Sequence, residues 1–299
     1  ANVIDGQVAG DVDLRSEIDA LATIVAGIMT TANGGTASPT LTAADFTKIG
    51  ITGVIGDNLT LTLAAITQTA NDGTAVDTLA EIQALLDYAF NALEIISLYD
   101  GTVATSTPVT ADYTSLGVTG VNDANVAAIN TVIAYASQFD TDTTAEVQAR
   151  VDVYNQILAS ADNGATGADL ALTKSNFQLI GVTSIDSEAK AGLLNDLIEQ
   201  ASLAEVDTLN KVRGLAVLVA SVFDVAAGTT PSHALTATDF AVMGITGVDA
   251  GNLALVLAAI AATANDASAV DTLAELQQVI TTALAAFATI ENYDGTNTE

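Results

Sequence analysis

The chain repeats itself, and this repetition limits the folds open to it more than any other feature. Four segments share an opening of Leu or Val followed by Thr and, within a few residues, an aromatic side chain; the aromatic positions are Phe46, Tyr113, Phe177 and Phe240. They are separated by 67, 64 and 63 residues. A regular period indicates a series of small structural units rather than one large core. We therefore expect units of about 64 residues.

A second signature follows each aromatic residue by four positions. It is a glycine, a β-branched residue, Thr and a small residue, found at Gly50–Val54, Gly117–Val121, Gly181–Ile185 and Gly244–Val248. Glycine accepts the left-handed backbone conformation with which many helices end. The signature therefore predicts that a short helix ends at each of these glycines.

A longer period of 194 residues is superimposed on the shorter one. Ala75–Glu81 recurs as Ala269–Glu275, and Val12 matches Val206 at the same offset of 194. Three types of repeat therefore alternate along the chain. Residues 1–34 correspond to the end of a third-type repeat, from which we expect the parent protein to continue upstream.

These periods predict the domain organisation. Segments rich in Gly, Thr, Ser and Pro, such as 100–107 and 226–232, have the composition of linkers between repeats. The predicted divisions are a partial repeat at 1–38, comprising a last helix and a linker, and four complete repeats at 39–107, 108–170, 171–233 and 234–299.

Each complete repeat reads as three helices. In the first of them, a short helix is expected from about Ala43 to Gly50 and a second from about Asp57 to Thr69. The third opens with Thr-x-x-Glu, a pattern that satisfies free amides at a helix start; it occurs at Thr78–Glu81, Thr143–Glu146 and Thr272–Glu275. The predicted fold class is all-α, as a tandem array of small three-helix bundles.

A short helix ending at Gly-Val or Gly-Ile, a brief turn and two further helices resemble the GA module. This module is a three-helix bundle of bacterial surface proteins, some of which bind serum albumin. The whole pattern is more similar to the GA-like tandem repeats of giant Gram-negative adhesins and related exported proteins. The resemblance covers residues 39–299 and rests on turns of the Gly50–Val54 type; no set of albumin-contacting residues is recognisable.

The third helices are apolar on nearly every side. Leu215–Val225 contains few polar residues, and Leu276–Ile290 is similar. A helix that is apolar all round is normally buried all round, which a bundle of about 64 residues cannot achieve alone. We therefore expect the extra apolar face to meet a neighbouring repeat or another chain, giving a semi-rigid rod or a filament.

The charge balance excludes several classes of partner. The chain has 36 acidic and 7 basic residues, a formal net charge of −29, and the basic residues are scattered. Without a basic stripe, binding to nucleic acid or to an anionic membrane surface is not expected. There is no cysteine, hence no disulfide or thiolate metal site. No membrane span is expected, since apolar stretches such as Leu253–Ala264 are too short, and no secretory signal heads the chain.

Catalytic constellations are also missing. The one histidine, His233, lies in a linker, where an exposed structural residue is the expected role, so neither an enzyme nor a cofactor site is predicted. Calcium is the chemical alternative, because carboxylates and amides share several turns. The candidate turns are Asn71–Gly73, Asp100–Gly101, Asp140–Asp142 and Asp162–Gly164. None has EF-hand spacing, and helix capping or turn formation is the preferred interpretation.

Two classes of function remain. The preferred prediction is a structural repeat segment of a secreted bacterial surface adhesin or extracellular fibre, with neighbouring repeats or copies of itself as partners. The alternative is a GA-like binding module that recognises a host or cell-surface protein. An ice-binding face is disfavoured, because the threonines gather at helix caps and linkers, and Thr60 and Thr62 form an isolated pair.

Overall fold

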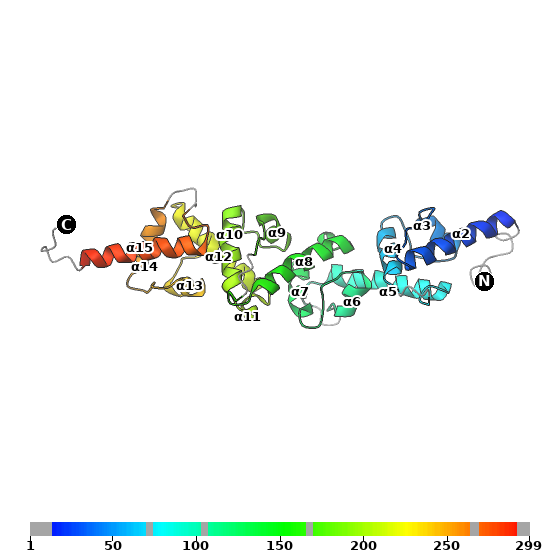
Figure 1. The fold of residues 1–299 in the computed structure, drawn as a ribbon, viewed down its shortest axis with the longest axis horizontal. Coiled ribbons are helices and arrows are strands. Elements are labelled where there is room, and N and C mark those ends of the chain that lie inside the picture. Colours follow the sequence, from blue (N-terminus) through cyan, green and yellow to red (C-terminus); the bar gives the residue numbers. More distant parts are fainter. Residues whose placement is uncertain (1–13, 70–73, 103–106, 166–169, 264–268, 292–299) are drawn as a thin grey trace. The chain divides into compact units, whose positions relative to one another are not determined.

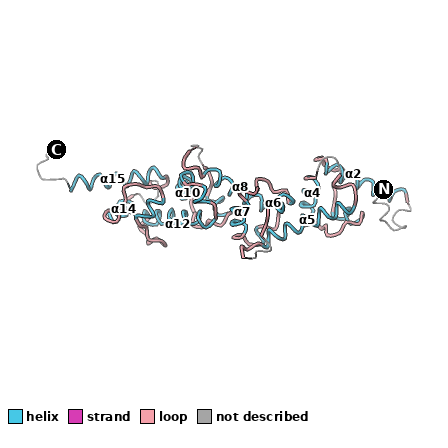
Figure 2. The backbone as a smooth tube through the Cα atoms, turned by 90° about the horizontal axis from the view of Figure 1, so that it is seen from below, coloured by secondary structure: helices cyan, strands magenta, loops and turns pink. Residues whose placement is uncertain are grey.

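The computed structural model describes residues 14–69, 74–102, 107–165, 170–263 and 269–291. Within these ranges the chain is all-helical and no strand is formed, although Asp162 and Ser202 make an isolated antiparallel bridge. The helices are joined by short loops (Figure 2). The chain divides into two compact units, Ala1–Val151 and Asp152–Glu299, with the division inside helix α8.

Unit 1 contains three kinds of helix that differ in length (Figure 1). The long ones are α2 (Arg15–Ala32), α5 (Leu79–Leu98) and the start of α8 (Thr144–Ser160). Those of intermediate length are α4 (Leu59–Thr67) and α7 (Val126–Ile133). The short ones are α3 (Ala43–Lys48), α6 (Thr110–Ser115) and the 3-10 turn η3 (Gln138–Asp140).

Unit 2 uses the same kinds of helix. After the end of α8 come the short helix α9 (Lys174–Leu179), α10 (Glu188–Gln200) and a single turn, α11 (Leu203–Val206). The long helix α12 (Leu209–Ala226) follows. The last group is the short α13 (Ala237–Val242), α14 (Leu253–Ala261) and the long α15 (Leu273–Glu291).

The short helices form where the sequence predicted them, because both ends are satisfied locally. At the start of α3, the Asp45 carboxylate accepts hydrogen bonds from the backbone amide and hydroxyl of Thr42, at 3.0 and 2.7 Å. Thr236 and Asp239 repeat this arrangement at α13. The glycines that end the short helices all have positive φ, namely 87° at Gly50, 81° at Gly117, 85° at Gly181 and 75° at Gly244. The predicted glycine stop is confirmed.

Three of the long helices, α5, α8 and α15, start at the predicted Thr-x-x-Glu boxes. At α5 the Thr78 hydroxyl donates to the Glu81 carboxylate at 2.8 Å and accepts from the Glu81 amide at 3.2 Å. The same reciprocal pair forms between Thr143 and Glu146 and between Thr272 and Glu275. Since these bonds satisfy amides that have no partner inside the helix, they place the helix start at a defined residue.

Two long helices, α5 and α12, each pack both against a helix that precedes them in the sequence and against a helix that follows them. In unit 1, α5 contacts α4, which precedes it, and also α6 and η3, which follow it. In unit 2, α12 contacts α10 and α11 and then α14. The segment 100–107 therefore lies between helices that pack on each other. Although this segment has the composition of a linker, the helix before it and the helix after it are in contact.

The sequence predicted no membrane span, whereas one helix in the described part of the chain is long and apolar enough to be a candidate. The window Leu273–Ile290 of α15 has 18 residues and a mean hydropathy of 1.3, so it could cross a membrane by length and composition alone. Its first half belongs to the core of unit 2, because Leu276 and Ile280 are completely buried. Most of the second half is exposed, with Ala283 and Leu284 half-buried.

Candidate functional site

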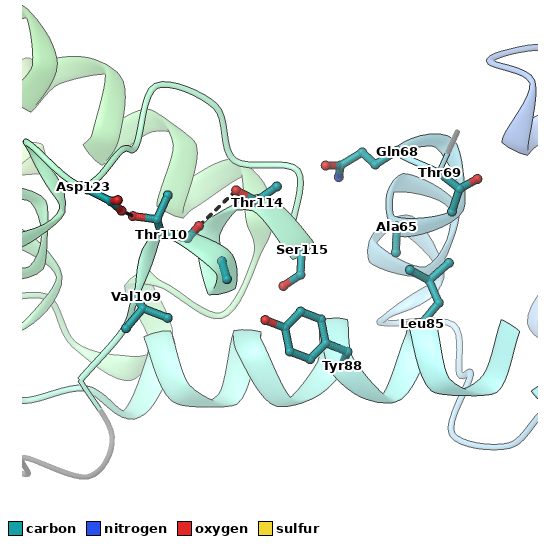
Figure 3. Close-up of a pocket in the computed structure, with 11 residues that line it drawn as sticks. Ala65, Gln68, Thr69, Leu85, Tyr88, Val109, Thr110, Thr114, Ser115 and Asp123 are labelled. Atoms are coloured by element: carbon teal, nitrogen blue, oxygen red, sulfur yellow. Dashed lines mark hydrogen bonds between the residues drawn. The ribbon is translucent and has the colours of Figure 1, made fainter. Parts of the chain in front are cut away.

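A groove lies in unit 1 where α4 and α5 meet α6. It has a volume of about 770 Å³ and is lined mainly by apolar atoms. Figure 3 shows Tyr88 of α5 and Gln68, which follows α4, pointing toward the Thr114 and Ser115 end of α6. On the opposite side, the Thr110 hydroxyl donates to Asp123 at 2.8 Å. The Tyr88 ring is 47% exposed, so the groove is open to a partner.

Unit 2 has a groove at the equivalent place, where α10 and α12 meet α13. Its volume is about 640 Å³. Counted from the start of each long helix, Leu215 and Leu218 of this groove occupy the positions of Leu85 and Tyr88. The groove therefore recurs in two types of repeat. Its border differs, since Glu205, Lys211 and Asp239 place charges of both signs around it.

A close contact repeats beside both grooves. A methyl group built on Gly117 would lie only 2.3 Å from the Gln68 side-chain nitrogen, and one built on Gly244 would lie 2.9 Å from the Gln200 side-chain oxygen. In each case the glutamine follows or ends a helix of intermediate length, and the glycine ends the next short helix. The positive φ favours glycine at both positions, and a methyl group there would also displace the end of the flexible glutamine side chain.

A second set of side chains secures the turn after each short helix. The Gln83 side chain accepts from the Thr52 amide at 2.8 Å and donates to the Thr52 carbonyl at 3.2 Å, which ties α5 to the turn. Gln148 does the same to Thr119, and Gln277 to Thr246. We call these three glutamines the turn glutamines. The sequence analysis missed them, although each lies five residues after the Thr of a capping box.

Asparagines close the same turns from the other side. Asn58 accepts from the Ile55 amide and donates to the Gly53 carbonyl, both at 2.8 Å. Asn125 and Asn252 make the matching pairs of bonds in their own repeats. The side-chain amides of these asparagines are hydrogen-bonded to the backbone, so none of them is a candidate for catalysis.

His233, the one histidine, contacts a residue that caps a helix. Its Nε2 lies 3.0 Å from the Asp239 carboxylate, and its side chain is 42% exposed, in keeping with the predicted exposed position. Partial burial alone would raise the pKa of Asp239, but hydrogen bonds from His233 and Thr236 outweigh it and the pKa is lowered. The Thr236 hydroxyl also donates to the Asp239 carboxylate, at 2.8 Å, as part of the cap of α13.

The calcium candidates are used locally where the structure describes them. Asp100 accepts from the Thr102 amide and hydroxyl, Asp140 from the Ser137 hydroxyl, and Asp162 from the Ala165 amide. The carboxyl of Asp142 has a raised pKa because it faces Glu146. Asn71–Gly73 lies outside the described residues. No group of three metal-ligating side chains is found among the residues that were placed.

Scans against protein-family models, curated proteins and solved structures each found no match. The chain's own repetition and the surfaces that recur with it are therefore the guides to function.

Proposed function

We propose that this chain is a structural repeat segment of a secreted bacterial surface adhesin or extracellular fibre. Successive repeats are small three-helix bundles of the GA-like kind, and packing of one repeat on the next gives a semi-rigid rod or filament. The role needs repetition, stiffness and solubility and needs no catalytic residue. The net charge of −29 suits an extracellular segment, because it opposes nonspecific association.

The observation that supports this proposal most directly is the double use of the long helices. The same α5 packs on α4, which precedes it in the sequence, and on α6 and η3, which follow it. Figure 3 shows α4 near Leu85 and α6 near Tyr88, about one turn further along α5. Its core side chains Leu86, Ala92 and Ile96 are completely buried along this length. A continuous helix transmits bending and rotation far better than a Gly/Ser-type linker does. Repeats joined in this way form a stiff connection.

The recurrence of the junction supports the same conclusion. The contacts of Gln68 with Gly117 and of Gln200 with Gly244 lie at corresponding positions of two different repeat types. If the repeats were joined by flexible linkers, a chance contact between two of them would not be expected to recur at the corresponding position of another pair. The junction is therefore part of the repeated design.

A proline in the middle of α5 tests the proposal. Asn91 is exposed, so Asn91→Pro removes helix continuity without removing a core side chain, at a cost of about 3 kcal/mol. We expect the repeats on its two sides to unfold in separate transitions and solution scattering to show a more flexible chain. Asn91→Ala should change neither. The matched control is Ala285→Pro, at the same position of α15, where the following half is exposed. A flexible scattering profile from the unmodified chain would contradict the rod.

The grooves favour a second candidate function, a GA-like binding module. Tyr88 and Val109 are 47% and 55% exposed at the edge of the unit 1 groove, and exposed apolar side chains in a hollow are typical of protein-binding sites. Serum albumin is the partner to test, by calorimetry on the whole chain. Binding that Tyr88→Ala weakens at least about tenfold would favour this function over a spacer. Absence of heat at high micromolar albumin would leave the spacer.

A further inference from the structure

The second half of α15 exposes an apolar face that the same chain covers elsewhere. α5 and α15 are related by the 194-residue period, so Ala92 corresponds to Ala286 and Ile96 to Ile290. Ala92 and Ile96 are 0% exposed, whereas Ile290 is 72% exposed and Ala286 is also exposed. Phe287, which replaces Leu93, is 43% exposed. Two copies of one surface thus lie in opposite environments.

The first halves of the two helices do not differ in this way. Leu86 of α5 and Ile280 of α15 are both 0% exposed, and each helix packs on the helix before it, α4 or α14. The turn glutamines Gln83 and Gln277 make the same bonds. The two helices are therefore equivalent up to their midpoints, and only the helices that would follow are different.

The partner that covers the second half of α5 is known from unit 1. It consists of α6 and η3, which belong to the repeat at 108–170 and contact α5 directly. Tyr113 of α6 and Leu116, which directly follows α6, are both 0% exposed. Because Ile96 and Ile290 are identical and Phe287 is as apolar as Leu93, the face of α15 fits the same kind of partner.

A lipid bilayer fits this face less well. The mostly exposed stretch from Thr281 to Ile290 has ten residues, and at 1.5 Å each it would span about 15 Å of a hydrocarbon core of about 30 Å. The rest of the span-length window is held in unit 2 through Leu276 and Ile280. The net charge of −29 also opposes approach to an anionic bilayer.

We propose that the exposed apolar side chains in the second half of α15, Ala286, Phe287 and Ile290, form a docking face for a further repeat of the 108–170 type. The docked repeat would lie against α15 as α6 and η3 lie against α5. The inference rests on the proposed packing of repeat on repeat. Of the three repeat types, the 108–170 type is the one that we expect to bind this face.

Extending the chain tests the proposal. Thr102 corresponds to Thr296, so the test chain carries a second copy of residues 103–160 after Thr296. Amide hydrogen exchange of residues 281–291 is compared with that in the unmodified chain. We expect at least about tenfold slower exchange in the extended chain, because the covering helices must open before these amides exchange.

Ile290→Asp provides the matched variant. Ile290 is exposed in the unmodified chain, so the substitution should leave that chain's stability unchanged. In the extended chain it should remove the added protection, because it places a charge in the new interface. Appending residues 170–226 instead supplies a repeat of another type and should protect 281–291 less.

Three results would overturn the proposal. One is unchanged exchange of residues 281–291 in the extended chain while the Asn91→Pro effect persists, which would leave the proposed rod standing. Another is protection in the unmodified chain that depends on its concentration, with dimers in ultracentrifugation, since a second copy would then cover the face. The last is protection that appears only with phosphatidylcholine vesicles, which would assign the face to a membrane.

Discussion

The repeats at 171–233 and 234–299 belong to the same unit and reach the same local geometry with different side chains. Both have a short helix with a buried phenylalanine, Phe177 or Phe240, followed by a glycine of positive φ. In the later repeat, Gln277 and Asn252 then tie down the turn. The earlier repeat has Arg213 at the position of Gln277.

The earlier repeat uses its own solution at the following helix. Ser187 caps α10 by accepting from the Lys190 amide, and Gln178 donates to the Ile185 carbonyl. α10 has 13 residues whereas α14 has 9, and the extra turn α11 follows it. Comparing the two repeats shows which residues the local fold needs and which can be replaced. The aromatic residue and the glycine are required, and the means of closing the turn can be exchanged.

The largest expected effect tests the shared part of this comparison. Phe177→Ala and Phe240→Ala each empty a site that is 0% exposed, so each should cost about 3–5 kcal/mol in its own repeat. Native-state hydrogen exchange of α10 and α14 amides measures the two losses separately. A cost below about 1 kcal/mol in either repeat would mean that the aromatic residue is not a common requirement.

A smaller effect is expected where the repeats differ. Gln277→Ala removes both bonds to Thr246 and should destabilise the 234–299 repeat by about 1 kcal/mol. The neighbouring Gln278 is exposed and bonds only within its helix, to Thr282, so Gln278→Ala is the control and should be nearly neutral. Equal losses from the two substitutions, measured by urea unfolding, would show that the turn glutamine has no special part.

The two features tested above also differ in how easily they could be predicted from the sequence. The short helices, their caps and their glycine ends are local features, so motifs such as Thr236–Asp239 and Gly244 were enough to predict them. The turn glutamines join positions about thirty residues apart, and only their recurrence after a capping box could have revealed them. α11 was not predicted either, because a single turn gives too little periodicity.

The grooves and the shared use of α5 could not be read from the sequence. Apolar periodicity shows that a helix has a face to bury, yet it does not say which neighbour covers that face. The excess apolar surface of the third helices predicted contact with a neighbouring repeat or another chain, and the composition of the segment 100–107 predicted a linker. The described structure packs α5 against helices on both sides of that segment.

Acid should distinguish the two repeats by a few tenths of a kcal/mol. The short helix α13 is capped through Asp239, whose pKa is lowered, whereas α9 is capped through the uncharged Asn176. A lowered pKa in the folded state gives stability that is present above the unfolded value of 3.8 and is lost as the pH falls through the folded value. The 234–299 repeat should therefore weaken below about pH 4, and 171–233 should not for this reason.

Asp239→Asn isolates that contribution. The variant should be slightly less stable at neutral pH and should lose the part of the acid dependence that belongs to this cap. Hydrogen exchange of α13 at pH 3.5 and pH 6, corrected for intrinsic rates, measures it. An unchanged pH dependence in Asp239→Asn would place the acid sensitivity elsewhere.

The smallest expected effect is that of removing divalent ions. The Asp162–Gly164 turn is held by backbone bonds, with the Asn163 and Gly164 amides donating to the Ala201 and Glu199 carbonyls. The melting temperature should thus stay nearly unchanged in EDTA for both kinds of repeat. A fall of more than about 10 °C, reversed by calcium, would show that a bound ion stabilises the folded state.

The continuity of the long helices has a consequence for how such a chain can change in length. An α-helix turns by about 100° and rises 1.5 Å for each residue, so one residue inserted near Asn91 of α5 would swing the apolar positions Ala92 and Ile96 away from α6. Three or four inserted residues would nearly restore the angle and shift the contact by about one turn. Insertions should therefore be absorbed in loops such as 100–107, while the number of residues between the two halves of each long helix sets the angular phase of one repeat relative to the next.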